Sequence, residues 1–242
     1  DNANVGMQQL FYADRPYQVY PLFILLKNLR PLRADCSLLS YLFSITAYPF
    51  QAEFLQRSVS TMLGKYLENV RKTIPLVHCI TNYVTVNDVA NVLLACGGSP
   101  IMSDEPEDVT DITSICQGLT INIGTLNQRS IESMFLAGKR ANELNHPVLL
   151  DPVGAGASAL RTNTAARLLQ ELSLCAVRGN ISEIKALAQG SSTTKGVDAD
   201  VADAVTDDTL DRSVAFVEEF SQKTGCIIAV TGAIDPVTDG TD

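Results

Sequence analysis

The sequence predicts an α/β protein in which helices cover a largely parallel β-sheet. The first observation behind this prediction is that short apolar runs of strand length alternate with amphipathic stretches of helical period. The second is that the apolar runs end in polar, often glycine-rich turns. Since sheets of this kind bind ligands at the carboxyl ends of their strands, the turns are where a functional site is expected.

The alternation begins near residue 60. Residues 60–72 carry apolar side chains at helical spacing, and Pro75 follows as a helix stop. Strands are predicted at Leu76–Ile80, Leu119–Ile123, Val148–Asp151, Ala176–Val177 and Cys226–Val230. Helices are predicted at Thr85–Cys96, Asp108–Cys116, Arg129–Leu144, Thr162–Glu171, Ser182–Ala188 and Asp208–Lys223. Residues 190–208, rich in Ser, Thr, Gly and Asp, predict a long loop.

Residues 1–58 receive no fold assignment. The uncharged stretch from Cys36 to Ala52 contains serines, a threonine and Pro49, and it is shorter than a typical membrane-spanning helix. A secretory signal would need a positively charged start and a cleavage site, and neither is placed correctly. The sequence therefore predicts an unassigned N-terminal extension over residues 1–58 and one α/β domain over residues 59–242.

Composition narrows the class of partner. A formal charge of −9, from 18 Lys and Arg against 27 Asp and Glu, argues against electrostatic binding of nucleic acid. Six cysteines without a CxxC pair and only two histidines give the pattern of neither a zinc knuckle nor a dense disulfide framework. Cysteines inside apolar strand patterns, such as Cys226, predict buried free thiols in a reducing, cytoplasmic compartment. The expected partners are small molecules, not nucleic acid or membrane.

Two carboxylates stand out at the predicted strand ends. Asp151 ends one strand, and Glu183 lies just inside a later helix. Oxygen ligands of this kind hold a hard cation that bridges phosphates, often through water. A structural alternative is open for each. Asn180 and Glu183 have the spacing of a helix capping box, and Asp151 followed by proline is also typical of a turn.

Five other features have two interpretations each. The turn Gly154–Gly156 lets a backbone approach a phosphate, or it is only a tight turn. Arg161 holds a phosphate with two hydrogen bonds, or it is a solvated surface residue. Thr231 contacts a nucleotide or caps a turn. His78, inside a strand, is a core histidine by default, with a catalytic base as the alternative. Met102 fills the core or lines a flat apolar pocket.

Six motifs together resemble the hydroxyethylthiazole kinase family, the thiamine-salvage branch of the ribokinase-like superfamily. They occur in the family's order, and the likeness covers roughly residues 60–239. The motifs are Pro75–Asn82 (PLVHCITN), Gly97–Met102 (GGSPIM), Asn122–Leu126 (NIGTL), Leu150–Gly156 (LDPVGAG), Arg178–Ile184 (RGNISEI) and Val230–Gly232 (VTG). The resemblance implies a ribokinase-like three-layer α/β/α fold with a largely parallel sheet.

The resemblance also implies an activity and a site. The activity is transfer of the γ-phosphoryl group of ATP, with Mg²⁺, to the primary hydroxyl of 4-methyl-5-(2-hydroxyethyl)thiazole. The implied assembly is a homotrimer with sites shared between neighbouring subunits. The implied site residues are Asn82, Val84 and Met102 for the thiazole, Arg161, Asn180 and Thr231 for ATP, and Asp151 and Glu183 for the metal.

The sequence departs from the family after the segment Val237–Gly240. Family members continue into a Gly-Thr-Gly-Cys turn that supplies an anion hole and the residue that activates the hydroxyl, and this turn is expected beyond Asp242. We therefore expect an incomplete domain that lacks its C-terminal part, no catalytic residue within this chain, and little or no kinase activity. Two alternatives are open: another ribokinase-like enzyme, such as a nucleotide-dependent NAD(P)H-hydrate dehydratase, and a non-catalytic fragment that only binds nucleotide or thiazole.

Overall fold

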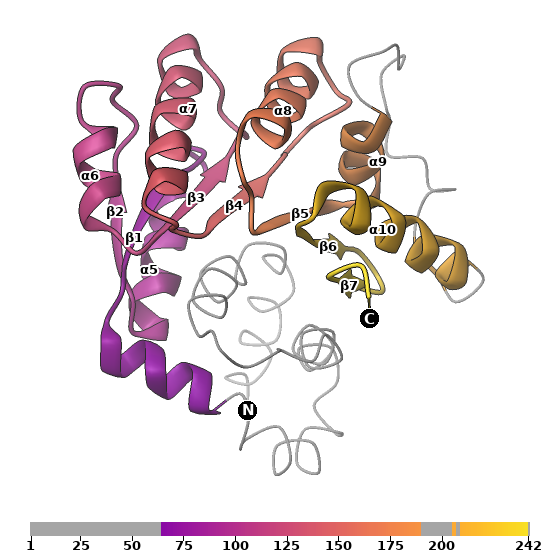
Figure 1. The fold of residues 1–242 in the computed structure, drawn as a ribbon, viewed down its shortest axis with the longest axis horizontal. Helices are drawn as coiled ribbons and strands as arrows, with labels where there is room; N and C mark the ends of the chain where they lie inside the picture. Colours follow the sequence, from indigo (N-terminus) through magenta and orange to yellow (C-terminus); the bar gives the residue numbers. More distant parts are fainter. Residues whose placement is uncertain (1–63, 190–204, 207–208, 242) are drawn as a thin grey trace, which may run out of the picture.

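The computed structural model describes residues 64–189, 205–206 and 209–241. The N-terminal segment 1–58 and most of the predicted loop over residues 190–208 lie outside the described residues. The described part forms the predicted α/β architecture (Figure 1). A helix over residues 64–73 precedes the first strand, in agreement with the helical spacing in this stretch.

The described strands form one seven-stranded sheet in the order β2-β1-β3-β4-β5-β6-β7. All neighbouring strands pair in parallel except β6 and β7, which are antiparallel. The largely parallel sheet is thereby confirmed. The strands are β1 (Leu76–Ile80), β2 (Ser99–Met102), β3 (Gly118–Asn122), β4 (Val148–Asp151), β5 (Ala176–Asn180), β6 (Ile227–Thr231) and β7 (Val237–Thr238).

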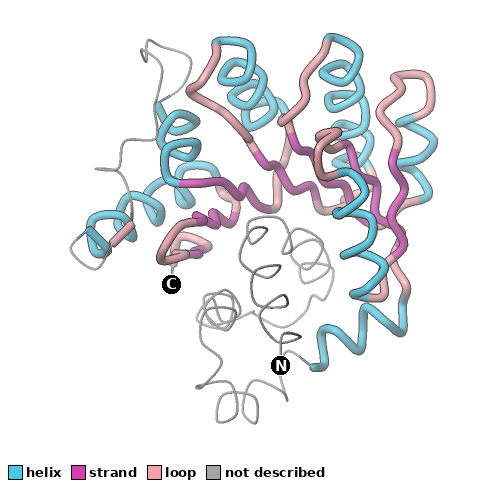
Figure 2. Tube along the Cα trace, turned by 180° about the vertical axis from the view of Figure 1, so that it is seen from behind, coloured by secondary structure: helices cyan, strands magenta, loops and turns pink. Residues whose placement is uncertain are grey.

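Helices cover both faces of this sheet, seen from opposite sides in Figures 1 and 2. They are α5 (Val86–Cys96), α6 (Val109–Ile115), α7 (Gln128–Glu143), α8 (Ala159–Glu171), α9 (Ile181–Gln189) and α10 (Leu210–Thr224). The crossover from β1 to β2 runs one way along the sheet, and every later parallel crossover runs the other way. Because such crossovers are right-handed, α5 lies on one face and α6 to α10 lie on the other.

Each face has its own apolar core. The larger core joins α6 to α10 to the sheet and includes Val109, Leu119, Ile121, Met134, Leu150, Leu168, Val177, Ile184, Val217 and Ile228. The smaller core lies on the α5 face and includes Val77, Cys79, Val89, Leu93, Leu149, Ala176 and Ala229. Alternate residues of one strand belong to opposite cores, as the two-residue period of a β-strand requires.

Local signals account for several helix ends. Asn127 and Ser130 form a reciprocal capping box at the start of α7, and the Ser158 hydroxyl accepts from the Arg161 N–H at the start of α8. At the end of α5, Gly97 adopts the left-handed conformation with φ of 94°. None of the described helices is long and apolar enough to cross a lipid bilayer.

Three strands differ from the sequence prediction: β2 and β7 were not predicted, and β5 is longer than predicted. Strand β2 was not predicted, because its four residues include Pro100 and lack the alternating apolar pattern. It is an edge strand, where proline is tolerated. Strand β5 extends through Asn180, so Arg178, predicted to lie in a turn, is a strand residue that is only 6% exposed.

The topology also indicates where along the sheet a ligand is expected. From β1 the chain moves to β2 on one side, and β3 then pairs with β1 on the other side. The strand order therefore reverses at β1 and β3, and the carboxyl ends of these two strands flank the switch point at which α/β sheets bind ligands.

Candidate functional site

The predicted site residues lie along the rim formed by the carboxyl ends of the parallel strands. Most come from strand ends, and the order of these ends follows the strand order of the sheet. From one side to the other they are Met102 at the end of β2, Asn82 after β1, Asp151 at the end of β4, Asn180 at the end of β5 and Thr231 at the end of β6. The fold therefore brings together residues that are up to 149 positions apart (82 to 231) in the chain.

The residues predicted to bind thiazole lie at the β1–β2 side of the rim. Met102 pairs in register with Cys79 of β1, and its side chain is half-buried. Asn82 is 6% exposed, whereas the side chain of Val84 is 87% exposed. This side of the rim therefore offers a buried amide between a half-buried thioether and an exposed aliphatic side chain.

Asn82 has its amide held by the loop that follows β1. Its Oδ1 accepts hydrogen bonds from the backbone N–H groups of Val84 and Thr85, both at 3.0 Å. The Thr85 hydroxyl donates to the same oxygen at 3.2 Å. The Nδ2 group of Asn82 donates to Oδ1 of Asn122 at 3.1 Å.

Asn122 continues this chain of hydrogen bonds across the sheet. It ends β3 and lies in register with Asp151 of β4. Its Oδ1 also accepts from the Gly124 N–H at 2.8 Å, and its Nδ2 donates to Oδ2 of Asp151 at 2.6 Å. Both residues are buried, at 4% and 1% exposure. A continuous chain of hydrogen bonds therefore leads from the β1–β2 side of the rim to the carboxyl group of Asp151.

Asp151 is an ionisable group in a dry environment. Burial raises its pKa well above the ordinary value, and the nearby Glu183 carboxylate raises it further. The Arg178 guanidinium acts in the opposite direction and favours the charged form. A cation at this position would likewise stabilise the carboxylate, so the electrostatics of the site fit a bound metal ion.

Glu183 forms the capping box that its spacing predicted. Its Oε2 accepts from the Asn180 N–H at 2.8 Å, and its own N–H donates to Oδ1 of Asn180 at 2.9 Å. Its Oε1 accepts from the Gly154 N–H at 2.8 Å, in the loop after β4. The carboxylate therefore both caps α9 and fixes the loop that carries the Gly154–Gly156 turn.

The two carboxylates predicted to bind a metal suit a Mg²⁺ ion that keeps several water ligands. They do not form the closed set of protein ligands that encloses some other metals. The described residues contain no group of three or more His, Cys, Asp or Glu side chains suited to hold a metal. Magnesium commonly uses one or two carboxylates and completes its shell with water and substrate phosphates. The Glu183 carboxylate lies close enough to raise the pKa of Asp151, so the two carboxylates are near each other, which matches that arrangement.

Arg161 has a role that the sequence did not predict. Its Nη1 donates to the carbonyl oxygens of Ile123 at 3.1 Å and Val153 at 2.9 Å, and its Nη2 donates to that of Gly124 at 2.9 Å. The guanidinium therefore ties the loop after β3 to the loop after β4. It is neither a solvated surface group nor a guanidinium whose two Nη groups are both open to a phosphate.

The predicted nucleotide residues Asn180 and Thr231 are neighbours. They lie in register at the ends of β5 and β6. Asp235, in the turn after β6, accepts from the Gly232 N–H at 2.7 Å. Burial raises the pKa of Asp235, while the Gly232 N–H and the Arg178 guanidinium lower it. Arg178 therefore interacts with carboxylates on both sides, Asp151 and Asp235.

His78 is the core histidine of the default interpretation. It is fully buried in β1, with Nδ1 2.9 Å from the Thr113 hydroxyl and Nε2 2.9 Å from the Ser103 carbonyl oxygen. A carbonyl oxygen only accepts, so Nε2 carries the proton and Nδ1 accepts from Thr113. Burial lowers the pKa of the imidazole, although the Ser103 carbonyl and Asp108 act against it. The neutral ring joins β1 to α6 and to the loop after β2.

Two rim residues were missed as site candidates, Asn122 and Arg178. Asn122 stood inside a motif, but its amide carries no sequence signal for its partners, which lie 40 and 29 positions away. Arg178 follows an apolar run, and a charged side chain there predicts the start of a turn. The sequence carries no signal that this arginine is buried beside carboxylates, which the structure shows.

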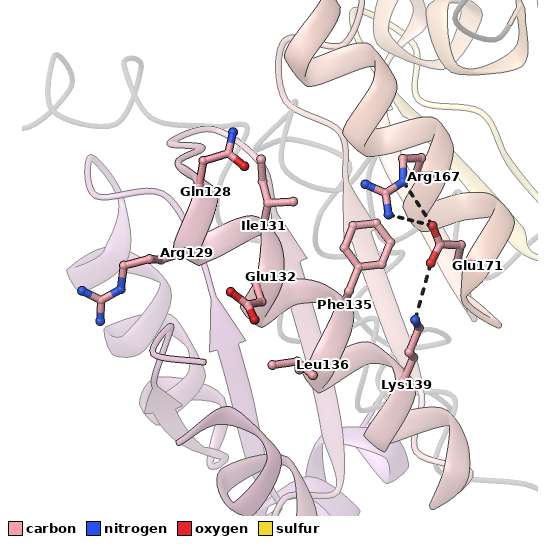
Figure 3. A pocket seen from close by; sticks show the side chains of 9 residues that line it. All are labelled: Gln128, Arg129, Ile131, Glu132, Phe135, Leu136, Lys139, Arg167 and Glu171. Carbon is pink, nitrogen blue, oxygen red and sulfur yellow. Dashed lines mark hydrogen bonds and ion pairs between the residues drawn. The ribbon is translucent and has the colours of Figure 1, made fainter. Parts of the chain in front are cut away.

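A surface depression lies away from this rim, on the outer faces of α7 and α8 (Figure 3). There the Arg167 guanidinium stacks 4.5 Å from the centre of the Phe135 ring and pairs with Glu171 at 2.9 Å. Lys139 approaches the same carboxylate at 3.6 Å. None of the predicted site residues lines this depression, so the rim is the candidate site.

Comparison with known proteins gives a consistent result. A sequence model of the hydroxyethylthiazole kinase family matches residues 67–242, a range that includes every predicted site residue. The chain is 64% identical over 178 residues to a hydroxyethylthiazole kinase of Clostridium acetobutylicum, which covers 74% of this chain and 65% of the relative. It is 52% identical over 186 residues to that of Clostridium beijerinckii, covering 77% of this chain and 67% of the relative.

A solved structure gives the same similarity in three dimensions. The hydroxyethylthiazole kinase of Pyrococcus horikoshii matches with a TM-score of 0.63 and 35% sequence identity, over 72% of this chain and 62% of that one. The chain therefore spans about two thirds of the length of these relatives, or slightly less.

Proposed function

Because the chain belongs to the hydroxyethylthiazole kinase family, we propose that the protein transfers the γ-phosphoryl group of ATP to the primary hydroxyl of 4-methyl-5-(2-hydroxyethyl)thiazole. The observation that carries the proposal is the order of side chains along one rim. Residues predicted for the alcohol, the metal and the nucleotide follow one another from β2 to β6. Phosphoryl transfer needs the acceptor alcohol, the metal ion and the nucleotide at one site.

The alcohol end of the rim is assigned to Asn82, Val84 and Met102. A thiazole ring is small, flat and mostly apolar, so a thioether and an aliphatic side chain suit its faces, and one amide suffices for a polar contact. Such a pocket orients the hydroxyl toward the phosphate, and alignment of this kind is a large part of what an enzyme contributes to the reaction.

The metal and nucleotide ends are assigned to the second half of the rim. Asp151 and Glu183 would hold Mg²⁺ and its water ligands, and the ion would supply neutralisation of phosphate charge. Asn180 and Thr231 offer an amide and a hydroxyl to ATP at neighbouring strand ends. Arg161 would reach a phosphate only through Nε and one remaining Nη2 proton, because its other Nη protons donate to carbonyl oxygens.

The family resemblance also implies a homotrimer whose sites lie between subunits. The 87% exposure of Val84, next to the buried Asn82, is consistent with a site that a neighbouring subunit completes. Light scattering of the purified protein tests this part of the proposal, and a monomer at the concentration used for binding would contradict it.

Titration with each ligand separates the proposed function from its alternatives. The proposal expects saturable binding of the thiazole alcohol and of MgATP. It also expects ADP formation that depends on the alcohol, and such turnover by the purified chain would overturn the expectation of little or no activity drawn from the sequence. Alcohol binding without turnover favours a non-catalytic binding protein, and binding of nucleotide without alcohol contradicts the proposal. The family match favours a kinase over a hydrate dehydratase.

Glu183→Gln tests the metal role. The substitution keeps the shape of the side chain but removes its charge, so we expect turnover to fall by about tenfold or more and the Mg²⁺ requirement to rise. Glu132→Gln, an exposed glutamate of α7, is the matched control. Unchanged rates in Glu183→Gln, with a melting temperature close to that of the control, would leave Glu183 only its capping role.

A further inference from the structure

We propose that Asn122 is a positioning residue. It couples the orientation of the side chain at the alcohol end of the rim, Asn82, to the carboxyl group at the metal end, Asp151. The proposal rests on the proposed function, because the roles of Asn82 and Asp151 come from it. Asn122 contacts both of these residues, and it is argued to act through them.

The orientation of the Asn82 amide is fixed by donors that cannot reverse. Its oxygen accepts from two backbone N–H groups, those of Val84 and Thr85. A backbone N–H can only donate, so an inverted amide would point its own NH₂ group at two donors. The NH₂ group of Asn82 therefore points toward Asn122.

The same argument fixes the orientation of Asn122. Its Oδ1 accepts from the backbone N–H of Gly124 and from Asn82, so its Nδ2 points toward Asp151. The hydrogen bonds consequently run in one direction, from the loop after β1 to a carboxylate on β4. The last bond, from Asn122 to the Asp151 carboxyl group, is the shortest of the chain at 2.6 Å.

Burial makes the three members interdependent. Asn82, Asn122 and Asp151 are 6%, 4% and 1% exposed, so water does not replace a partner that is lost. If the carboxylate no longer accepts, the Asn122 amide loses its 2.6 Å hydrogen bond to β4 and is held less firmly. The Asn82 amide, whose NH₂ group donates to Asn122, is then held less firmly as well. In this way the fixed pairing of β3 with β4 helps to position the side chain of Asn82, which lies in the loop after β1.

A matched pair of substitutions tests this coupling. Asp151→Ala and Asp151→Asn both remove the charge, but only Asn keeps an oxygen that accepts from Asn122. We expect the dissociation constant of the thiazole alcohol, measured by calorimetry without ATP or Mg²⁺, to rise about fivefold or more in Asp151→Ala. In Asp151→Asn it should stay within about twofold of wild type. Equal affinities in the two variants would overturn the proposal.

A second variant keeps the test valid if Asp151→Ala does not fold. Asn122→Leu removes every polar atom of the side chain at similar volume. We expect it to weaken binding of both the alcohol and Mn²⁺, each about fivefold or more, although Asn122 is assigned to neither ligand. Asn142→Leu is the control, because it breaks two side-chain hydrogen bonds to Ser173, in an exposed position away from the rim. A purely structural role predicts that both variants lose stability and neither loses affinity.

Failure of the proposed function can be recognised separately. A wild-type protein that binds no thiazole alcohol contradicts that function. The coupling is then decided by the side-chain amide protons of Asn82, observed by NMR. Their protection from solvent exchange should fall in Asp151→Ala and persist in Asp151→Asn, and equal protection in both would overturn the coupling.

Discussion

At the scale of single residues, Gly124 shows how little space the rim leaves beside its amides. A Cβ atom at this position would lie 2.9 Å from Oδ1 of Asn122 and 2.9 Å from Cβ of Asn82. Side-chain atoms do not approach so closely without displacing something. The absence of a side chain at Gly124 is therefore a condition for the hydrogen-bond chain that crosses the sheet.

We predict that Gly124→Ala weakens binding of the thiazole alcohol by about tenfold, because the new methyl group displaces the two amides. Calorimetry on the purified variant measures this effect. The control is Gly232→Ala in another rim turn, where a Cβ would lie 3.5 Å from the Ile234 carbonyl oxygen, an ordinary contact. Wild-type affinity in Gly124→Ala would show that the rim relaxes around the methyl group.

The sequence predicted which side chains stand at the rim but not what they bond to. Asp151 and Glu183 were found because they follow strands or open helices, which is a local signal. The partners of Glu183 and Arg161 include backbone groups of Gly154 and Ile123, 29 and 38 positions away. A backbone N–H or C=O group is present at almost every residue, so no sequence pattern marks the one that is used.

At the scale of secondary structure, two helices end in the same unusual way with different residues. Ile74, after the helix over residues 64–73, has φ of 46°, and Asn145, after α7, has φ of 57°. Asparagine tolerates this left-handed conformation, whereas a β-branched side chain is strained in it. Ile74 is also 58% exposed, so little packing offsets the strain.

We predict that Ile74→Asn raises the free energy of unfolding by about 1 kcal/mol, because asparagine relieves the backbone strain at this position. The matched substitution Asn145→Ile should lower it by a similar amount. Denaturant unfolding of the two variants and the wild type measures both. A loss of stability in Ile74→Asn would mean that the packing of its side chain outweighs the strain.

Elements were predicted well wherever one periodic pattern ran without interruption. Strands β1 and β4 and helix α5 lie within one residue of their predicted bounds. Strand β2 was missed because four residues with a central proline carry too little pattern. The end of β5 was missed because the charge of Arg178 interrupts an apolar run, although nearby carboxylates offset that charge inside the fold.

At the scale of the whole molecule, stability is linked to the two histidines. His78 is fully buried as a neutral ring, and burial lowers its pKa below the ordinary value of 6.5. The unfolded chain therefore binds a proton at pH values where the folded chain does not. Stability from this source is complete above about pH 6.5 and is lost as the pH falls below it.

We predict that the free energy of unfolding falls on acidification below pH 6.5, by up to about 1.4 kcal/mol per pH unit from a single buried histidine. His78→Gln should reduce this dependence, since glutamine does not titrate. In His146→Gln the reduction should be smaller, because His146 is only half-buried, although burial lowers its pKa too. Equal slopes in wild type and His78→Gln, from urea unfolding between pH 5 and 7, would contradict the assignment.

The proline of β2 affects how the sheet meets other molecules. The Ser99 N–H donates to the Pro75 carbonyl oxygen, on the side of β1, so the next residue along the strand presents its backbone nitrogen outward. That residue is Pro100, which has no hydrogen to donate. An extended peptide that paired with the outer edge of β2 would find no backbone N–H donor at Pro100. Addition of a foreign strand to this edge of the sheet is therefore disfavoured, which protects the protein against aggregation through β2.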